Sequence, residues 1–335
     1  MQALINNKYK QIRLRYNLTL SVVLSIFYAT VIVLLPWELI SKDGFPDFEN
    51  YKLNFEYYIA SGTSYVELYD LSSIIQYFTR EVMWYKIIYA LHELTDDVVT
   101  SLRSVSFFIA FIFCLFLLRK VGFKYSLLFL INPSVIDVAM SGIRNGLAWV
   151  LIVIAFWARS EIIKLVLFVV AIFIHSTSLV LFLLYYLTRT AAHYFKGRTL
   201  LIIGIAAGLG VGFALTVLNE MVLGVIGDRR SGLEYLVGGG SFKLASIWVL
   251  LILLQCTSGS EYIKKNIFAI SVIAWYHVMN QYIPGSYRIW AALMPIIALS
   301  IMDLPIKRRS LFILLYICYM GMQYFYWSKL YFLFY

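Results

Sequence analysis

The chain carries little charge for its length. Of its 335 residues, 14% are Asp, Glu, Lys or Arg, whereas 61% are hydrophobic. A water-soluble globule needs more polar surface than this composition provides. The composition therefore excludes a soluble enzyme and predicts a polytopic membrane protein.

Cysteine and histidine are scarce as well. The three cysteines lie inside apolar runs without Cys-x-x-Cys spacing, and the four histidines are widely scattered. This distribution argues against a disulfide framework and a zinc site, and it favours chemistry that either needs no metal or uses a borrowed ion. The net charge of +10 is spread over short loops rather than gathered in one tract. That spread suits anionic lipid headgroups and argues against nucleic acid as a partner.

Apolar runs of about 20 residues, the length that crosses a bilayer, recur along the chain. The first, "LTLSVVLSIFYATVIVLLPW", follows basic residues and precedes no small-residue cleavage site, so we expect a retained span with a cytoplasmic N-terminus. Further spans are predicted at about 100–118, 199–218, 243–259, 266–282, 286–303 and 310–327. We expect one all-α membrane domain over residues 1–335, with about nine to eleven transmembrane or re-entrant helices.

Residues 38–97 form the one sizeable polar region, and their charge is mostly acidic. An acidic loop suits the outer face of the membrane. Within it, the stretch "VMWYKIIYALHEL" is short and rich in aromatic residues. This pattern favours an interfacial helix over a span.

Residues 125–187 do not fit a simple count of crossings. The basic loops that this arrangement places in the cytoplasm lie at 119–124, 189–198, 264–265 and 307–309. An even number of crossings must then separate residues 124 and 189. The sequence between them, however, reads as three apolar blocks, at 125–140, 143–159 and 163–187. One block must be broken, half-spanning or re-entrant, unless one of the loops departs from the charge rule.

Backbone that is not helical at membrane depth is tolerated only where it lines a watery or protein-enclosed cavity. A cavity is therefore predicted near "INPSVIDVAMSGIRNGLAW". Arg144 lies 17 residues before Glu161 in the polar link "RSEIIK", and His175 lies 14 residues after it. At 1.5 Å of rise per residue, their depths in two antiparallel helices differ by about 5 Å, so they can face each other. If the link is cytoplasmic, as we favour, both approach the outer face.

His175 is the candidate proton acceptor, because an unperturbed imidazole has a pKa of about 6.5. It can equally be a structural histidine that bonds Ser176, Ser178 or a backbone carbonyl. Arg144 can pair with Asp137, seven residues away, or snorkel to the interface.

Other polar and small residues have simpler interpretations. Arg288, which begins a span after a Pro-Gly turn, can snorkel, and Arg229 and Arg230 can be loop charges. The glycines of "GIAAGLGVG", at 204–212, favour close helix packing over phosphate binding, because no strand precedes them.

The stretch "SGIRNGLAWVLIVIAFWA", followed by a charged link and "VVAIFIHSTSLVLFLLYYL", resembles a pattern of EpsG-like proteins. In that pattern an Arg, a polar residue and an Ala precede a His-x-Ser by about 30 residues. These proteins belong with the Wzy-type polymerases of bacterial polysaccharides such as O-antigen and capsule. The later "YRIWAALMPIIAL" is similar to an Arg-led late span of the family, whereas Asn145 stands where Gln is common.

The resemblance implies a glycosyltransferase of the GT-C type in the bacterial inner membrane, with its site facing the periplasm or exterior. Such an enzyme moves a growing glycan from undecaprenyl diphosphate to the non-reducing-end hydroxyl of another lipid-linked repeat unit. It needs no nucleotide or other cofactor, and a chain-length regulator is an expected partner alongside membrane lipids.

Residue roles follow from this resemblance. His175 would be the base, Arg144 and Arg288 would stabilise the diphosphate, and Asp137 would orient Arg144 or His175 or compete as the base. The remaining expected substrate contacts are Asn145, Ser178, Arg229, Arg230 and Tyr287.

Two other functions suit a basic cavity in a membrane. A transporter or flippase for lipid-linked glycans would explain a broken helix, although the sequence has no internal repeats. An acyltransferase that modifies glycans would also use a membrane histidine as base. The fate of the lipid-linked repeat units distinguishes the three functions. A polymerase lengthens them, a transporter relocates them and an acyltransferase acylates them.

Overall fold

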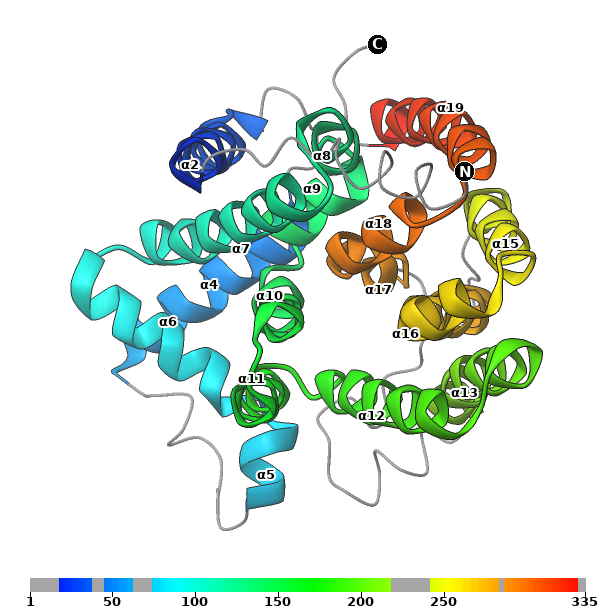
Figure 1. Ribbon diagram of the computed structural model, residues 1–335. Coiled ribbons are helices and arrows are strands. Elements are labelled where there is room, and N and C mark those ends of the chain that lie inside the picture. The colour runs from blue at the N-terminus through cyan, green and yellow to red at the C-terminus, as the bar shows by residue number, and fades with distance from the viewer. Residues whose placement is uncertain (1–17, 38–44, 63–73, 218–241, 283–285, 331–335) are drawn as a thin grey trace.

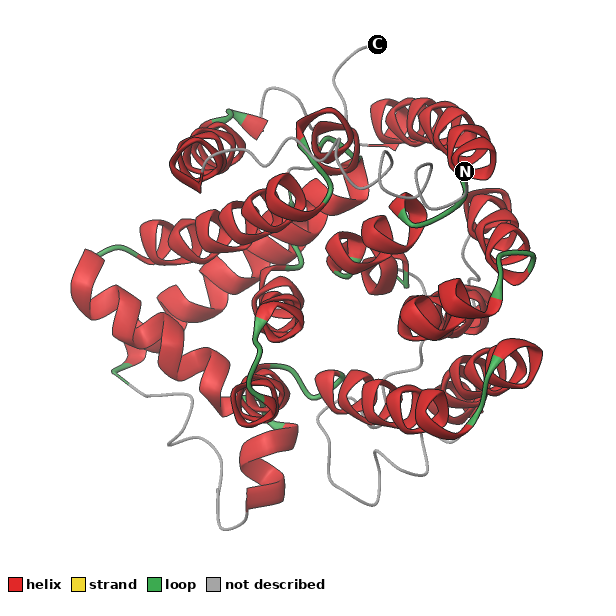
Figure 2. Ribbon diagram, in the orientation of Figure 1, coloured by secondary structure: helices red, strands yellow, loops and turns green. Residues whose placement is uncertain are grey.

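The computed structural model describes residues 18–37, 45–62, 74–217, 242–282 and 286–330. Every regular element in these ranges is a helix, which confirms the predicted all-α fold class (Figure 2). The first helices are α2 (Leu18–Leu34), α4 (Pro46–Ser61), α5 (Ile74–Thr79), α6 (Val82–Thr95), α7 (Val98–Lys120), α8 (Phe123–Leu130), α9 (Pro133–Met140) and α10 (Ile143–Trp157). They are followed by α11 (Glu161–Ile174), α12 (Ser178–Tyr194), α13 (Gly197–Val217), α15 (Phe242–Cys256), α16 (Ser260–Tyr282), α17 (Tyr287–Ala292), α18 (Met294–Met302) and α19 (Ile306–Leu330).

Most predicted spans correspond to one helix each. Among the described residues, α7 and α13 are long and apolar enough to cross a membrane, and the bent pair α8–α9 is a third candidate. The span predicted at 286–303 is instead two helices, α17 and α18, that meet at Leu293. Pro295 lies in the first turn of α18, where its missing N–H costs no intrahelical hydrogen bond.

Residues 125–187 are divided by four breaks, which separate α8, α9, α10, α11 and α12. α8 and α9 meet at an angle of 69°. Asn132 caps α9 by accepting a hydrogen bond from the N–H of Ser134, and Pro133 follows as the first helical residue. The block predicted at 163–187 contains both α11 and α12, because the helix stops at His175. With the bent pair counted as one unit, four helical segments lie between residues 124 and 189, namely α8–α9, α10, α11 and α12. An even number is compatible with the crossing count predicted from the basic loops.

Polar contacts tie the links together at one end of the bundle. They join Glu161 to Arg189 and Lys164, the Gly197 N–H to Ser260, Lys265 to Asp303, and Arg308 to the Thr257 carbonyl. Arg144 and His175 lie at the far ends of α10 and α11 from this link face. The basic links and the candidate site therefore occupy opposite ends.

The acidic region folds against the bundle. The Phe55 ring of α4 contacts Trp84, Tyr85 and Tyr89 of α6, with ring centroids 5.4 to 6.5 Å apart. Phe55 and Trp84 are fully buried, so these helices are a packed layer rather than a loose loop.

The glycines of α13 permit close contact with α16. A Cβ on Gly208 would lie 2.1 Å from the Ser271 carbonyl oxygen, and one on Gly212 would lie 2.7 Å from Val278 Cβ. The helix-packing interpretation of residues 204–212 is thereby confirmed.

α17 and α18 lie near the middle of the molecule, between α10, α16 and α19 (Figure 1). Trp290, Leu293 and Ile297 of these helices are completely buried. α17 also contacts α9. Its first turn therefore brings Arg288 to the interior of the bundle.

Candidate active site

Glu81 is a buried carboxylate that joins two other ionisable residues. Its Oε1 lies 2.6 Å from Nδ1 of His175, and its Oε2 lies 2.8 Å from Nη1 of Arg144. The backbone N–H and the hydroxyl of Ser176 donate to the same Oε1 at 3.2 and 3.3 Å. The Glu81 side chain is fully enclosed, and those of Arg144 and His175 are 15% and 7% exposed. We call these four residues the Glu81 centre.

Helix ends position the members of the Glu81 centre. Glu81 precedes α6 with a φ of 55°, a left-handed conformation that is uncommon outside glycine. His175 follows α11 in extended conformation, and Ser176 lies in the turn before α12. The positive end of the α12 dipole therefore faces the carboxylate. This end and Arg144 together compensate a buried negative charge that would otherwise be costly.

A second ion cluster surrounds Arg288. Asp137 Oδ2 accepts hydrogen bonds from the Tyr287 hydroxyl at 2.8 Å and from Arg288 Nε at 3.2 Å. Nη1 of Arg288 also donates to Asp47, and its Nη2 lies 3.5 Å from the Ser141 hydroxyl. We call these five residues the Asp137 centre. It joins α4, the break between α9 and α10, and α17.

Tyr51 connects the two centres. It lies one turn after Asp47 on α4, and its ring centroid is 5.7 Å from the guanidinium carbon of Arg144. Tyr51 is within electrostatic range of Glu81 and Arg144 and also of Asp47 and Arg288. The two centres are therefore parts of one polar region.

A membrane protein with this polar region matches one known family over nearly its whole length. The EpsG family model covers residues 26–335. The chain belongs to the EpsG family. Comparison with curated proteins and with solved structures gives no match. Membership of the EpsG family, together with the apolar helices, supports a membrane polysaccharide polymerase in general terms.

In this EpsG family member, Arg144 and His175 come close together, as their similar depths predict. The acid that contacts both is Glu81 and not Asp137, which contacts Arg288. The seven-residue spacing that suggested an Asp137–Arg144 pair assumes one continuous helix. The break between α9 and α10 lies between the two residues, so the helical repeat does not carry across it.

The other predicted site residues are distributed around these centres. Asn145 follows Arg144 on α10 and is half-buried. Ser178 is buried in the first turn of α12, and its hydroxyl has no hydrogen-bond partner within the described part of the chain. Arg288 contacts two carboxylates instead of snorkelling to the interface. Arg229 and Arg230 lie outside the described residues.

Sequence reasoning missed four members of the polar region, namely Asp47, Tyr51, Glu81 and Ser141. The first three belong to the region 38–97, where acidic residues suit a solvated outer loop. Glu81 is 94 residues away from His175, so no spacing rule connects them. The one local signal is its position directly before the apolar and aromatic run that forms α6.

Proposed function

We propose that this EpsG family member joins lipid-linked repeat units into a polysaccharide at the outer face of the cytoplasmic membrane. The donor is a glycan on polyprenyl diphosphate, and the acceptor is the non-reducing-end hydroxyl of a second lipid-linked repeat unit. The Glu81 centre is the observation that supports this most strongly. It places a histidine held by a carboxylate beside an arginine, at the broken ends of membrane-embedded helices.

His175 is the proposed base. When Nδ1–H is donated to Glu81, the imidazole is held in the tautomer whose Nε2 accepts a proton. The acceptor hydroxyl gives its proton to Nε2 as its oxygen attacks the anomeric carbon of the donor. The bond from that carbon to the diphosphate oxygen breaks, and the polyprenyl diphosphate leaves with the electron pair. Glu81 stabilises the imidazolium that forms until the proton passes to water.

Arg144 is the proposed contact for the leaving diphosphate. A guanidinium has five N–H donors in a planar fork, so it can hold Glu81 and a phosphate oxygen together. Its charge is fixed, and a low-dielectric site strengthens its effect on the developing negative charge. Asn145 and Ser178, which lie beside Arg144 and His175 along the chain, are the proposed contacts for sugar hydroxyls.

Arg288 has a different role in this proposal. The Asp137 centre contains two carboxylates and one guanidinium, so it attracts a diphosphate less than the Glu81 centre does. We assign Arg288 and Asp137 to holding α17 against α9, where they fix one wall of the site.

The distribution of basic residues supports an outer-face site. The links with most of the positive charge lie at the end of the bundle opposite Arg144 and His175. Positively charged links remain in the cytoplasm in most membrane proteins. The Glu81 centre then faces the compartment in which lipid-linked repeat units are joined.

The test compares His175→Ala, Arg144→Ala and Arg288→Ala in a strain that lacks the native gene, with membrane levels of the protein measured. Polysaccharide length is read on gels. We expect single repeat units with His175→Ala and with Arg144→Ala, and shorter or fewer chains with Arg288→Ala. Arg159→Ala is the matched control, because Arg159 is exposed and lies at the opposite end of α10.

Two results would contradict the proposal. Long chains from both His175→Ala and Arg144→Ala would show that the Glu81 centre is not the site. Loss of all repeat units from the outer face, with the precursors accumulating inside, would favour a transporter.

A further inference from the structure

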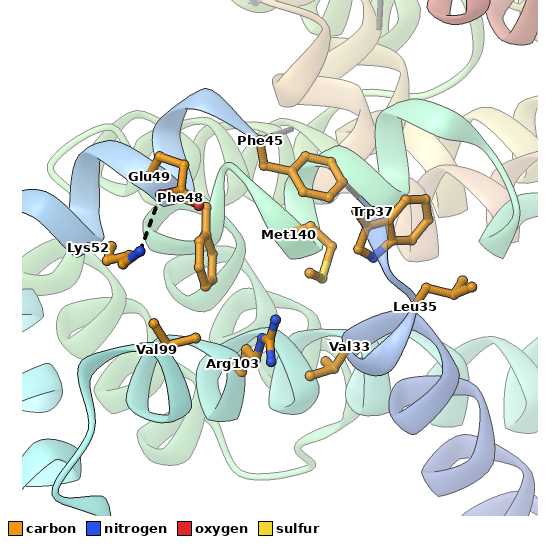
Figure 3. A pocket seen from close by; sticks show the side chains of 10 residues that line it. All are labelled: Val33, Leu35, Trp37, Phe45, Phe48, Glu49, Lys52, Val99, Arg103 and Met140. Carbon is orange, nitrogen blue, oxygen red and sulfur yellow. Dashed lines mark ion pairs between the residues drawn. The ribbon is translucent and has the colours of Figure 1, made fainter. Parts of the chain in front are cut away.

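A cavity of about 160 Å³ lies between α2, α4, α7 and the end of α9 (Figure 3). Its walls are largely aliphatic and aromatic, with Trp37 and Phe48 among them. Three charged side chains reach it, those of Glu49, Lys52 and Arg103. The cavity therefore combines an apolar lining with a small number of charges.

Arg103 gives this cavity an uncompensated positive charge. Glu49 and Lys52 face each other at 3.8 Å and largely cancel. Arg103 is exposed, and no ion pair or hydrogen bond joins it to another residue in the part of the chain that the structure describes. Figure 3 shows its guanidinium directed from α7 into the space below Met140. An anionic group in the cavity would be its natural counter-charge.

The cavity shares two walls with the candidate active site. On α4, Asp47 contacts Arg288, and the next residue, Phe48, lines the cavity. At the end of α9, Met140 lines the cavity, and the next residue, Ser141, contacts Arg288. The cavity and the Asp137 centre therefore use neighbouring residues on α4 and at the end of α9.

The cavity also lies at the side of the molecule that a membrane lipid reaches. α2 forms one wall and exposes large apolar side chains along its outer face, including Phe27 at 66% and Leu34 at 68%. A surface of this kind suits contact with hydrocarbon chains. A prenyl chain can therefore pass from the bilayer along α2 to the Arg103 cavity.

We propose that the Arg103 cavity binds the phosphate end of the acceptor, the second lipid-linked repeat unit. This inference rests on the proposed function, because joining two lipid-linked molecules requires that both phosphate ends be held at once. Arg144 holds the donor's end, so a second cation is needed for the acceptor. The cavity has room for about five waters, which suits a phosphate group and excludes a whole oligosaccharide. The glycan of the acceptor extends from it towards His175.

The test measures initial rates in nanodiscs with two substrates that cannot exchange roles. The donor is capped at its non-reducing end, and the acceptor carries a phosphonate that cannot leave. We expect Arg103→Ala to raise the KM for the acceptor about tenfold or more, since hydrogen bonds to charged groups contribute that much. The KM for the donor and kcat should stay unchanged. Arg103→Lys should restore part of the affinity, and Arg159→Ala is the matched control.

Several outcomes would overturn the inference. These are an unchanged KM for the acceptor, an equal rise in KM for both substrates, or the same rise in KM when the acceptor is carried on an uncharged alkyl chain. Disappearance of the Arg103→Ala effect in phosphatidylcholine nanodiscs would assign the cavity to bulk anionic lipid instead.

A separate binding measurement distinguishes failure of this inference from failure of the proposed function. Native mass spectrometry of the full chain with polyprenyl phosphate requires no turnover. Weaker binding to Arg103→Ala than to the Arg159→Ala control is expected even in a His175→Ala background. Equal binding to the two would reject the cavity as a phosphate site, whatever reaction the protein performs.

Discussion

Glu81 combines three features that are uncommon in one residue. It is charged, completely buried and held at a φ of 55°. Backbone strain of this kind persists only where surrounding contacts determine it, and it gathers at functional sites. Here the contacts are those to His175, Arg144 and the start of α12. The strained turn thus sets the position of the carboxylate between the proposed base and the proposed cation.

Replacing Glu81 should separate its structural role from its catalytic role. Glu81→Gln keeps the shape and most hydrogen bonds but removes the charge, so we expect a folded protein whose elongation rate falls about 100-fold or more. Glu81→Ala also removes the carboxylate that pairs with the guanidinium of Arg144, which should lower the stability by about 3 to 5 kcal/mol. The measurements are chain elongation and the thermal unfolding of purified protein. Wild-type rates from Glu81→Gln would show that the carboxylate does not act through His175.

At the scale of helices, breaks rather than spans build the site. The turns between α9 and α10 and between α11 and α12 supply Ser141 and Ser176 to the two centres. A continuous helix satisfies its own backbone groups, whereas a broken one leaves N–H groups that can bind an anion. α13 and α16, in contrast, are unbroken helices, and the contact between them depends on close packing.

Of the small residues in that contact, Gly208 should be the least tolerant of a larger side chain. Gly208→Ala would bring a Cβ to 2.1 Å from the Ser271 carbonyl oxygen, so the helices must separate. We expect a loss of about 1 to 3 kcal/mol of stability, measured as a lower unfolding temperature in detergent. Gly210→Ala is the control on the same helix, because a Cβ there meets nothing within 4 Å. Equal changes in the unfolding temperature of both variants would mean that the close approach of Gly208 to Ser271 does not matter.

Glu161 should give the link face a measurable pH dependence. Hydrogen bonds from Arg189 and Lys164 lower the pKa of Glu161 to about 2. Because the pKa of Glu161 is lower in the folded state than in the unfolded state, its ion pairs stabilise the fold fully above the unfolded-state pKa of about 4.3. This stabilisation is lost as the pH falls towards 2. The pair is solvent-exposed, so the contribution is about 1 kcal/mol or less.

The unfolding temperatures of wild type and Glu161→Gln should therefore differ slightly at pH 6 and converge between about pH 4.3 and 2. Glu93→Gln serves as a control for removing an exposed acid. A constant difference across this range would contradict the assignment.

Sequence patterns predict the helices well and their breaks poorly. α7 and α13 follow from long apolar runs, which have the length needed to cross a bilayer. The stop at His175 lies inside an apolar block and depends on contacts from Glu81, which comes much earlier in the chain. The charge rule predicts a break between residues 125 and 187, and two of the observed breaks lie in the stretch 131–149 where the sequence predicts a cavity. Breaks made by distant partners leave little local signal.

At the scale of the whole molecule, the two ends of the bundle have different chemistry. One end holds the basic links, and the other holds the Glu81 centre, the Asp137 centre and the Arg103 cavity. The proposed orientation makes use of this division, with the basic links in the cytoplasm and the Glu81 centre on the outer side.

The orientation can be measured with single cysteines in a variant that lacks Cys114, Cys256 and Cys318. Cysteine at exposed Glu93 should react with a membrane-impermeant maleimide added to intact cells, whereas cysteine at exposed Lys264 should react only after lysis. The reverse pattern would place the Glu81 centre in the cytoplasm and exclude polymerisation on the outer face.

The long sequence separations within the Asp137 centre have a consequence for biosynthesis. Arg288 follows Asp137 by 151 residues and Asp47 by 241. At ribosomal rates of about 5 to 20 residues per second, roughly 8 to 30 s pass between the synthesis of Asp137 and that of Arg288. Two carboxylates thus depend on the insertion machinery, or on water within it, until α17 arrives. A nascent chain stalled before α17 lacks the guanidinium that these two carboxylates contact in the folded protein.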